Sequence, residues 1–142
     1  TCSKSAETDF DADYLFAEVG MNFSAITAKL GYEVLGSDNG CYAFATPLAT
    51  LHKFNGWSDQ FLGTLSQGLV DVTFTLTGKA GGGNWVLAYH DFSADTPTES
   101  VDDLGSEITL QYATTFAMHY TAAIKYAVYS GESGRVDAKK VW

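Results

Sequence analysis

Apolar and polar residues alternate along much of the chain. Between Val70 and Lys79, valine, phenylalanine and leucine alternate with aspartate, threonine and lysine. A period of two is typical of a β-strand whose two faces meet different surroundings. The pattern predicts six strands of about ten residues and the start of a seventh: Tyr14–Phe23, Ala25–Leu35, Val70–Lys79, Trp85–Phe92, Glu107–Ala113, Tyr120–Tyr129 and Val136–Trp142. Only Trp85–Phe92 is apolar on both faces, so its orientation is open.

Short and long connections alternate between these strands. Short turns are expected near Ser24, at Gly81–Gly83 and near Phe116, whereas residues 36–68, 93–106 and 130–137 read as longer loops. Long loops on one rim and short turns on the other are typical of outer-membrane barrels. Strands of about ten residues also match a tilted bilayer crossing. We therefore expect an all-β fold, an antiparallel transmembrane β-barrel built as an up-and-down meander, with only part of the barrel in this chain.

A soluble β-sandwich or a small ligand-binding barrel is the alternative, because alternation alone does not say which face points inward. Such a protein would be secreted and would bind a small apolar ligand. Two features favour the membrane barrel. The polar face carries full charges and many threonines, as a wet lumen would, and aromatic residues lie at strand ends, as in interfacial girdles. These aromatic residues are Tyr14, Phe23, Tyr32, Trp85, Tyr120 and Tyr129.

Composition agrees with a β protein and excludes some functions. The chain has 142 residues, which is one domain or a piece of a larger one. Its 14 glycines, 2 prolines and 14% aromatic residues favour strands over helices. A formal net charge of -9 excludes nucleic acid as a partner, since nucleic-acid binders are basic. No apolar run reaches the ~18 residues that a membrane-spanning helix needs.

Several longer motifs resemble a known family. They are Gly31–Gly36 (GYEVLG), Thr46–Leu62 (TPLATLHKFNGWSDQFL), Tyr89–Asp95 (YHDFSAD), Lys125–Ala127 (KYA) and Asp137–Trp142 (DAKKVW). From about Asp13 onward the chain resembles the C-terminal part of bacterial alginate-export-like porins. That resemblance implies a pore for polar solutes in the outer membrane of a Gram-negative bacterium. Such porins have many more strands, so it also implies that this chain is a fragment.

Charged and hydroxyl residues on the predicted polar face are candidates for a pore lining, where they would set the field that solutes feel. They are Glu18, Lys29, Glu33, Asp71, Thr73, Thr75, Lys79, Glu107 and Lys125. Ordinary solvated positions on a polar face would look the same. Glu18 and Lys29 fall nearly opposite each other in the first hairpin, so a cross-strand ion pair is expected.

The 36–68 segment is expected as a long extracellular loop, yet it is too apolar for a flexible one. Trp57, Phe61, Leu62 and Leu65 have helical spacing, which predicts a short helix. The segment would either fold into the lumen and narrow it, with His52, Lys53 and Trp57 at the constriction, or pack against the rim. Residues 1–12 precede the strands of 13–142 as an N-terminal loop segment.

The two cysteines, Cys2 and Cys41, lack metal-ligand spacing. If the first turn faces the periplasm, both lie on the outer rim, where a disulfide would close a loop of roughly 40 residues. His52, His90 and His119 are dispersed, so no metal site is expected. No nucleophile or phosphate-binding motif is present, so we expect neither a cofactor nor an enzyme.

The partners that follow are outer-membrane lipid, small polar solutes and the remaining strands of the barrel, either from the same polypeptide or from other chains. Bacterial single-chain barrels have an even number of strands and at least eight, so six strands and a stub cannot close one. The bacterial outer membrane is the expected location, with the short turns in the periplasm and the long loops outside.

Overall fold

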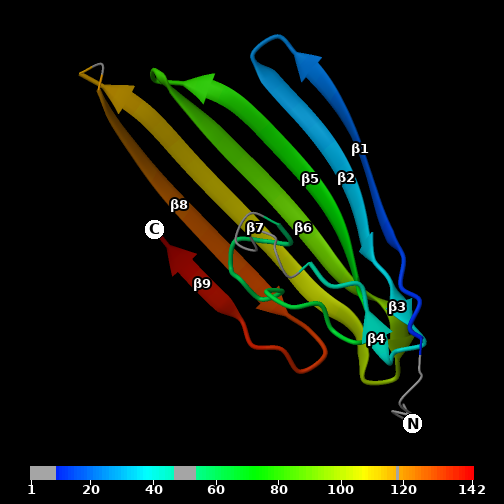
Figure 1. Cartoon of the computed structure of the whole chain (residues 1–142). Coiled ribbons are helices and arrows are strands. Elements are labelled where there is room, and N and C mark those ends of the chain that lie inside the picture. Colours follow the sequence, from blue (N-terminus) through cyan, green and yellow to red (C-terminus); the bar gives the residue numbers. More distant parts are fainter. Residues whose placement is uncertain (1–8, 47–53, 118) are drawn as a thin grey trace.

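The computed structural model describes residues 9–46, 54–117 and 119–142. A seven-stranded sheet in the order β1-β2-β5-β6-β7-β8-β9 contains most of them (Figure 1). Its strands are β1 (Tyr14–Phe23), β2 (Ile26–Leu35), β5 (Leu69–Ala80), β6 (Gly83–Thr98), β7 (Val101–Phe116), β8 (Tyr120–Gly131) and β9 (Ala138–Val141). The two-residue strands β3 (Ser37–Asp38) and β4 (Tyr42–Ala43) form a separate hairpin.

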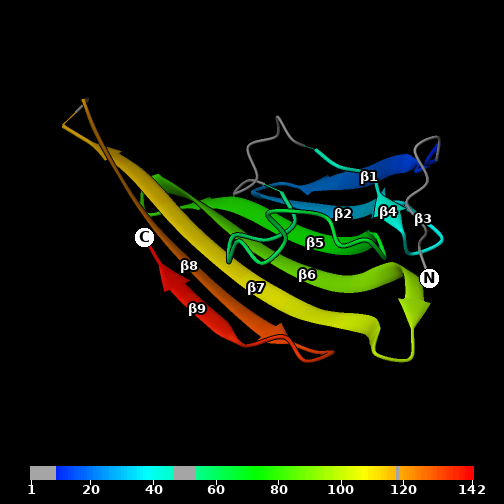
Figure 2. The same ribbon diagram turned by 60° about the horizontal axis from the view of Figure 1, so that its bottom comes forward.

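Every pair of neighbouring strands in the large sheet is antiparallel, and each neighbour in space is also the next sheet strand along the chain. The expected all-β, antiparallel up-and-down meander is therefore confirmed. The sheet curves but does not close, so β1 and β9 are its two edges (Figure 2). Among the described residues, no helix is long and apolar enough to span a membrane.

The short turns were predicted correctly and lie at one rim, at the top of Figure 1. Gly81 and Gly82 both have positive φ, of 56° and 80°. This geometry is that of a type I′ turn, whose backbone twist matches the twist of the flanking strands. Ser24 and Ala117 adopt φ of 53° and 49° in the two other short turns. All three hairpins therefore reverse tightly at the same end of the sheet.

The 93–106 loop prediction was wrong. β6 runs on to Thr98 and β7 begins at Val101, so only Glu99 and Ser100 connect them. Register shifts after Phe92 and Ser93 interrupt the pairing, as β-bulges do. Gly105 lies beside them with φ of 102°, and a Cβ there would lie 2.1 Å from the carbonyl oxygen of Ser130. The bulges break the period of two, which is why the sequence pattern did not indicate strands here.

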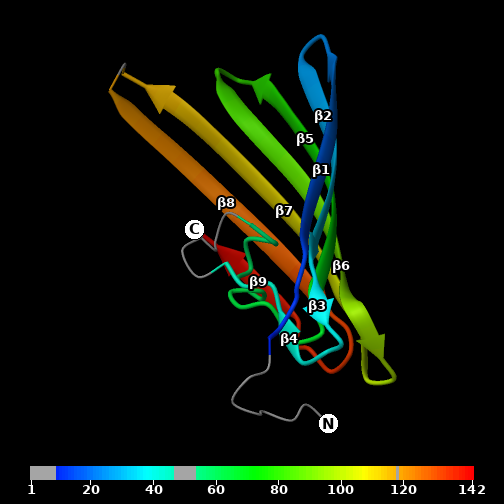
Figure 3. The same cartoon turned by 45° about the vertical axis from the view of Figure 1, so that its right-hand side comes forward.

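The expected helix near Trp57 is also absent. Residues 54–68 form turns and bends, because Asn55, Gly56 and Asp59 have positive φ that no α-helix allows. Instead of a helix, the segment contributes Phe61 to the apolar core. That core forms where the segment packs on one face of the sheet, and Figure 3 shows the segment on that face. Its buried members are Leu35, Phe61, Leu69, Phe92, Leu104 and Tyr129.

Candidate functional site

The strand registers divide the side chains between two faces, since residues paired across antiparallel strands point to the same side. We call the side that carries residues 54–68 the polar face and the opposite side the apolar face. One row on the polar face runs Glu18, Gly31, Thr73, His90, Glu107 and Tyr129. One row on the apolar face runs Val19, Leu30, Phe74, Tyr89, Ile108 and Val128.

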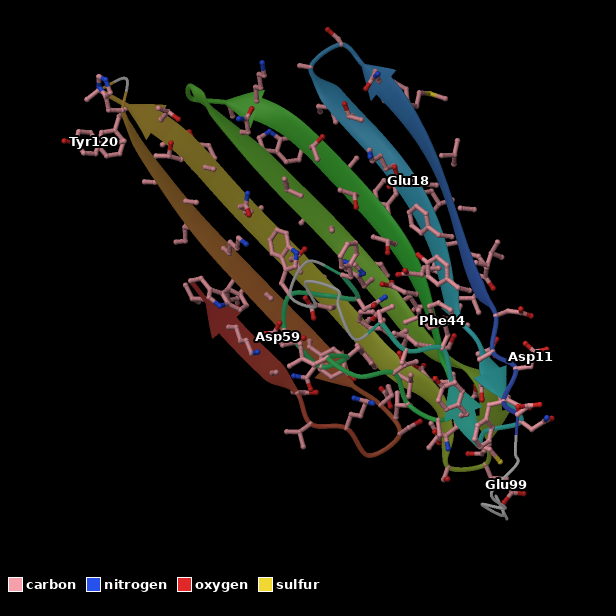
Figure 4. The ribbon with its side chains drawn as sticks, viewed as in Figure 1. Asp11, Glu18, Phe44, Asp59, Glu99 and Tyr120 are labelled. Carbon is pink, nitrogen blue, oxygen red and sulfur yellow. The ribbon has the colours of Figure 1, made fainter. Side chains whose placement is uncertain are left out.

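The register places all nine predicted lining residues on the polar face. The expected ion pair is present, with Lys29 Nζ 2.7 Å from Glu18 Oε1. Side chains that point into the hollow of the sheet are drawn in Figure 4, in which Glu18 is labelled. Lys79 stands apart from the others near the short-turn rim, opposite Asn84. Whether these residues line a pore stays a prediction.

The apolar face leaves its large side chains exposed. Exposed fractions reach 67% at Val19 and 58% at Ile124 and are 46% at Phe74. Seven apolar residues of β5, β7 and β8 lie on this face: Val72, Phe74, Leu76, Ile108, Leu110, Ile124 and Val128. Monomeric soluble proteins rarely expose so large and continuous an apolar surface.

Two of the aromatic residues expected in the interfacial girdles lie elsewhere. Tyr129 is fully buried on the polar face, where its ring centroid is 6.0 Å from that of Phe61 and its hydroxyl donates to the Leu104 carbonyl. Tyr14 is also on the polar face, where its hydroxyl donates to Glu33 at 2.8 Å. The period of two assigns a residue to a face only where apolar and polar neighbours alternate. Both residues lie at strand ends, where this alternation is lost. Phe23, Tyr32 and Trp85 do lie on the apolar face.

Glu107 anchors residues 54–58 to the polar face. Its side chain is 1% exposed and accepts hydrogen bonds from the Trp57 amide at 2.5 Å, the Ser58 amide at 3.1 Å and the Ser58 hydroxyl. Gly56 has φ of 85°, and a Cβ there would lie 2.6 Å from Glu107 Oε2. Only glycine therefore allows the backbone to approach the carboxylate this closely.

A second anchor involves Asn55. Its amide donates to Glu33 at 2.8 Å and to Asp71 at 3.3 Å. Asp71 is 2% exposed and is also contacted by the Thr73 hydroxyl and by His90 Nδ1, each at 3.0 Å. These contacts join β2, β5 and β6 to the segment. Burying a carboxylate is costly unless it is hydrogen-bonded, and here Asp71 is.

Two lysines complete the attachment on the side toward β9. Lys140 Nζ lies 2.8 Å from Asp59 Oδ2, and Lys125 Nζ lies 5.0 Å from the centroid of the Trp57 ring. Trp57, which was predicted at a constriction, thus donates its backbone amide to Glu107 of β7, and its ring contacts the ammonium group of Lys125 of β8. The segment is fixed across the polar face rather than packed only at the rim. His52 and Lys53, the other two constriction candidates, lie outside the described residues.

A cavity of about 490 Å³ remains between the segment and the first four strands of the sheet. Small residues of β2, β5 and β6 form its floor, including Gly31, Thr73 and Ala88. Aromatic and charged side chains form its walls: Tyr14, Phe16, Glu18, Lys29, Glu33, Phe54, Trp57, Asp71 and His90. Together they make this cavity the candidate functional site.

Several residues of the site were not foreseen. The face of His90 was ambiguous because Trp85–Phe92 has no apolar-polar contrast, and Phe16 is an apolar residue on a polar face. The pair Asn55-Gly56 is a turn signal that would have pointed to positive φ. No local signal indicates that Ser58 binds Glu107, because 49 residues separate the two.

Cys41 is disulfide-bonded. Its expected partner, Cys2, lies outside the described residues, so the pairing stays a prediction. Within the described ranges, no three His, Cys, Asp or Glu side chains are grouped as a metal site requires. Comparisons with protein families, curated proteins and solved structures found no match for this chain.

Proposed function

We propose that this chain forms part of the wall of an outer-membrane β-barrel channel through which small polar solutes diffuse passively. The observation that supports it best is the separation of the two faces. The apolar face is exposed over its whole width, and the polar face is charged and hollow. Lipid on the outside and water on the inside would satisfy both faces.

The position of the apolar residues supports a tilted crossing of a bilayer. On β1 the apolar run of this face extends from Leu15 to Phe23, and on β8 it extends from Tyr120 to the half-buried Val128. When the register is followed from β1 to β8, the β8 run is displaced along the strands by about four residues, or ~13 Å, relative to the β1 run. The sheet between these two strands is ~24 Å wide. This displacement corresponds to a strand tilt of ~30°, close to the ~35–45° of outer-membrane barrels.

The height of the apolar run agrees as well. Leu15 to Phe23 covers eight steps along an extended strand, which is ~27 Å. At a tilt of ~30° that run is ~23 Å tall, against the ~25 Å apolar band of outer-membrane barrels. Both the slope and the height of the apolar surface are thus those that a bilayer would require.

The open edges determine what must complete such a wall. β1 and β9 run in the same direction because five strands, each antiparallel to its neighbours, separate them. Joining them directly, or joining two copies head to tail, would create a parallel pair. An all-antiparallel barrel therefore needs an odd number of further strands between β9 and β1. These strands would also pair the free backbone groups of β1, each of which would cost on the order of several kcal/mol if left unpaired in lipid.

In the proposed channel, residues 54–58 narrow the lumen. They cross the polar face and are anchored by Glu107, Glu33 and Asp71, and Lys140 holds the next residue, Asp59. A solute on this side of the sheet would pass between the segment and β1, through the 490 Å³ cavity.

The runner-up, a soluble secreted β-barrel or sandwich with a small apolar ligand, fits less well. In such a protein the apolar side chains would face a shared core, whereas here Val19, Leu30 and Ile108 are at least half exposed. The core that does exist lies on the opposite face, under residues 54–68. In the part of the chain that the structure describes, the hollow on the apolar face beside Val19, Leu30 and Phe74 is open rather than enclosed.

Reconstitution tests the proposal. The complete protein, purified in detergent from the outer-membrane fraction, is added to a planar lipid bilayer and ionic current is recorded. We expect discrete conductance steps. A protein that stays monomeric in buffer without detergent and gives no conductance would contradict the proposal and favour the runner-up.

A further inference from the structure

We propose that the cavity on the polar face selects small organic cations, such as alkylammonium or guanidinium compounds. This inference rests on the proposed channel and names its preferred class of solute. It follows from three features of the cavity: a carboxylate that no basic side chain of the described residues pairs with, aromatic walls beside it, and a floor of small residues.

Charge gives the first reason. Three carboxylates line the cavity, at Glu18, Glu33 and Asp71, against one lysine, Lys29. Lys29 is already paired with Glu18, and Asp71 is in contact with His90. Among the described residues, Glu33 accepts hydrogen bonds from the neutral groups of Tyr14 and Asn55, and no basic side chain forms an ion pair with it. Its negative charge is thus available to a cation in the cavity.

Aromatic walls give the second reason. Phe16 lies directly opposite Glu33 in the β1–β2 register, on the same face. Phe54 lines the cavity from residues 54–68, which we call the crossing segment. Phe16 is 55% exposed on the polar face. An aromatic ring attracts cations through its quadrupole, and organic cations lose less hydration than small metal ions when they contact it.

The same face already uses this chemistry within the chain. Lys125 Nζ lies 5.0 Å from the centroid of the Trp57 ring, and the Arg135 guanidinium lies 4.6 Å from that of Phe61. Both rings belong to residues 54–68, and Trp57 also lines the cavity. A solute ammonium against Phe16 and Phe54 would make a contact of the same kind.

Space gives the third reason. Gly31 pairs with Glu18 on one side and with Thr73 on the other. Because glycine has no side chain, the row of residues next to Phe16 and Glu33 leaves open space at its centre. A cavity of about 490 Å³ falls within the size range of small-molecule sites, ~300–1,000 Å³.

The test uses the complete, assembled channel in a planar bilayer. Reversal potentials in a KCl gradient measure the preference for cations, and titration with tetraethylammonium measures block. We expect potassium to permeate better than chloride and tetraethylammonium to reduce the current. Single-channel currents come only from folded channels, so a lower yield of a variant does not imitate the effect.

Two pairs of variants separate the effect of the Glu33 charge from that of the Phe16 ring. Glu33→Gln should lower both the cation preference and the block, whereas Glu99→Gln, the same change in the exposed β6–β7 turn, should alter neither. Phe16→Leu should weaken the block by about two- to fivefold, the range of an exposed cation–π contact, and keep the cation preference. Phe116→Leu is its control, because Phe116 is equally exposed, at 54%, but lies at the short-turn rim.

The outcomes distinguish this inference from the function on which it rests. A channel that conducts without preferring cations, or in which Glu33→Gln and Glu99→Gln behave alike, would overturn the cation inference and leave the channel intact. An equal block of wild type and Phe16→Leu would overturn the role of the aromatic wall. The absence of any conductance would overturn the proposed channel itself.

Discussion

The two faces of the same sheet differ in what covers them. On the polar face, charged side chains are covered by the chain itself: Glu107 and Asp71 are almost completely buried beneath residues 54–58. On the apolar face, Val19, Phe74 and Ile124 are exposed and nothing in the described chain covers them. A water-soluble protein would have the reverse arrangement. This contrast between the faces is the one that the proposed wall, with lipid on one side and water on the other, would require.

The largest expected effect comes from placing a charge on the apolar face. Phe74 and Thr75 are neighbours on β5 that point to opposite faces. In the proposed membrane setting, Phe74→Arg should destabilise the folded barrel by about 2–4 kcal/mol, the cost of arginine near the bilayer midplane. Thr75→Arg, facing the lumen, should cost far less. Urea titrations in lipid vesicles measure both, and equal costs at the two positions would contradict the assignment of faces.

A smaller effect is expected where the crossing segment is anchored. Glu107→Gln replaces an acceptor oxygen with an NH₂ group that faces the Trp57 and Ser58 amides, which should cost about 1–3 kcal/mol. Gly56→Ala acts on the same contact, through its positive φ and the space beside Glu107, and should cost about 1–2 kcal/mol.

Because the two substitutions release the same segment, the double variant should cost less than the sum of the single ones. Release of the segment should also widen the proposed lumen and so increase the single-channel conductance, which is measured on the same variants. Additive costs with an unchanged conductance would show that Glu107 does not hold the segment across the lumen.

Sequence periodicity predicted the sheet well because each strand has unlike neighbours on its two sides. The bounds of Tyr14–Phe23 were correct, and Lys29 was correctly paired with Glu18. The prediction failed where that contrast is lost. Bulges near Phe92 disguised two strand ends as a loop, and the apolar run around His90 hid which face it belongs to.

The contacts of the crossing segment were out of reach for a different reason. The hydrogen bonds from Trp57 and Ser58 to Glu107 join residues about fifty positions apart, and no spacing rule relates them. Apolar content indicated that residues 36–68 pack against something. It could not indicate that positive φ at Asn55 and Gly56 would replace the expected helix with a turn around a carboxylate.

The smallest effect is expected at the ion pair of the first hairpin. Lys29 and Glu18 keep side-chain exposures of 43% and 38%, so water and salt screen their attraction. Lys29→Gln should therefore change the free energy of unfolding by only about 0.2–1 kcal/mol, and less at high salt. A loss as large as that of Phe74→Arg would mean that the polar face is shielded from water.

Spin labels along β5 test the central claim most directly. One label at a time replaces Val72, Thr73, Phe74, Thr75, Leu76 and Thr77 in the assembled protein in lipid, and collision rates with oxygen and with a water-soluble nickel chelate are measured. We expect oxygen, which concentrates in lipid, to dominate at 72, 74 and 76, and the nickel chelate to dominate at 73, 75 and 77. Uniform access of the chelate to all six positions would contradict the account.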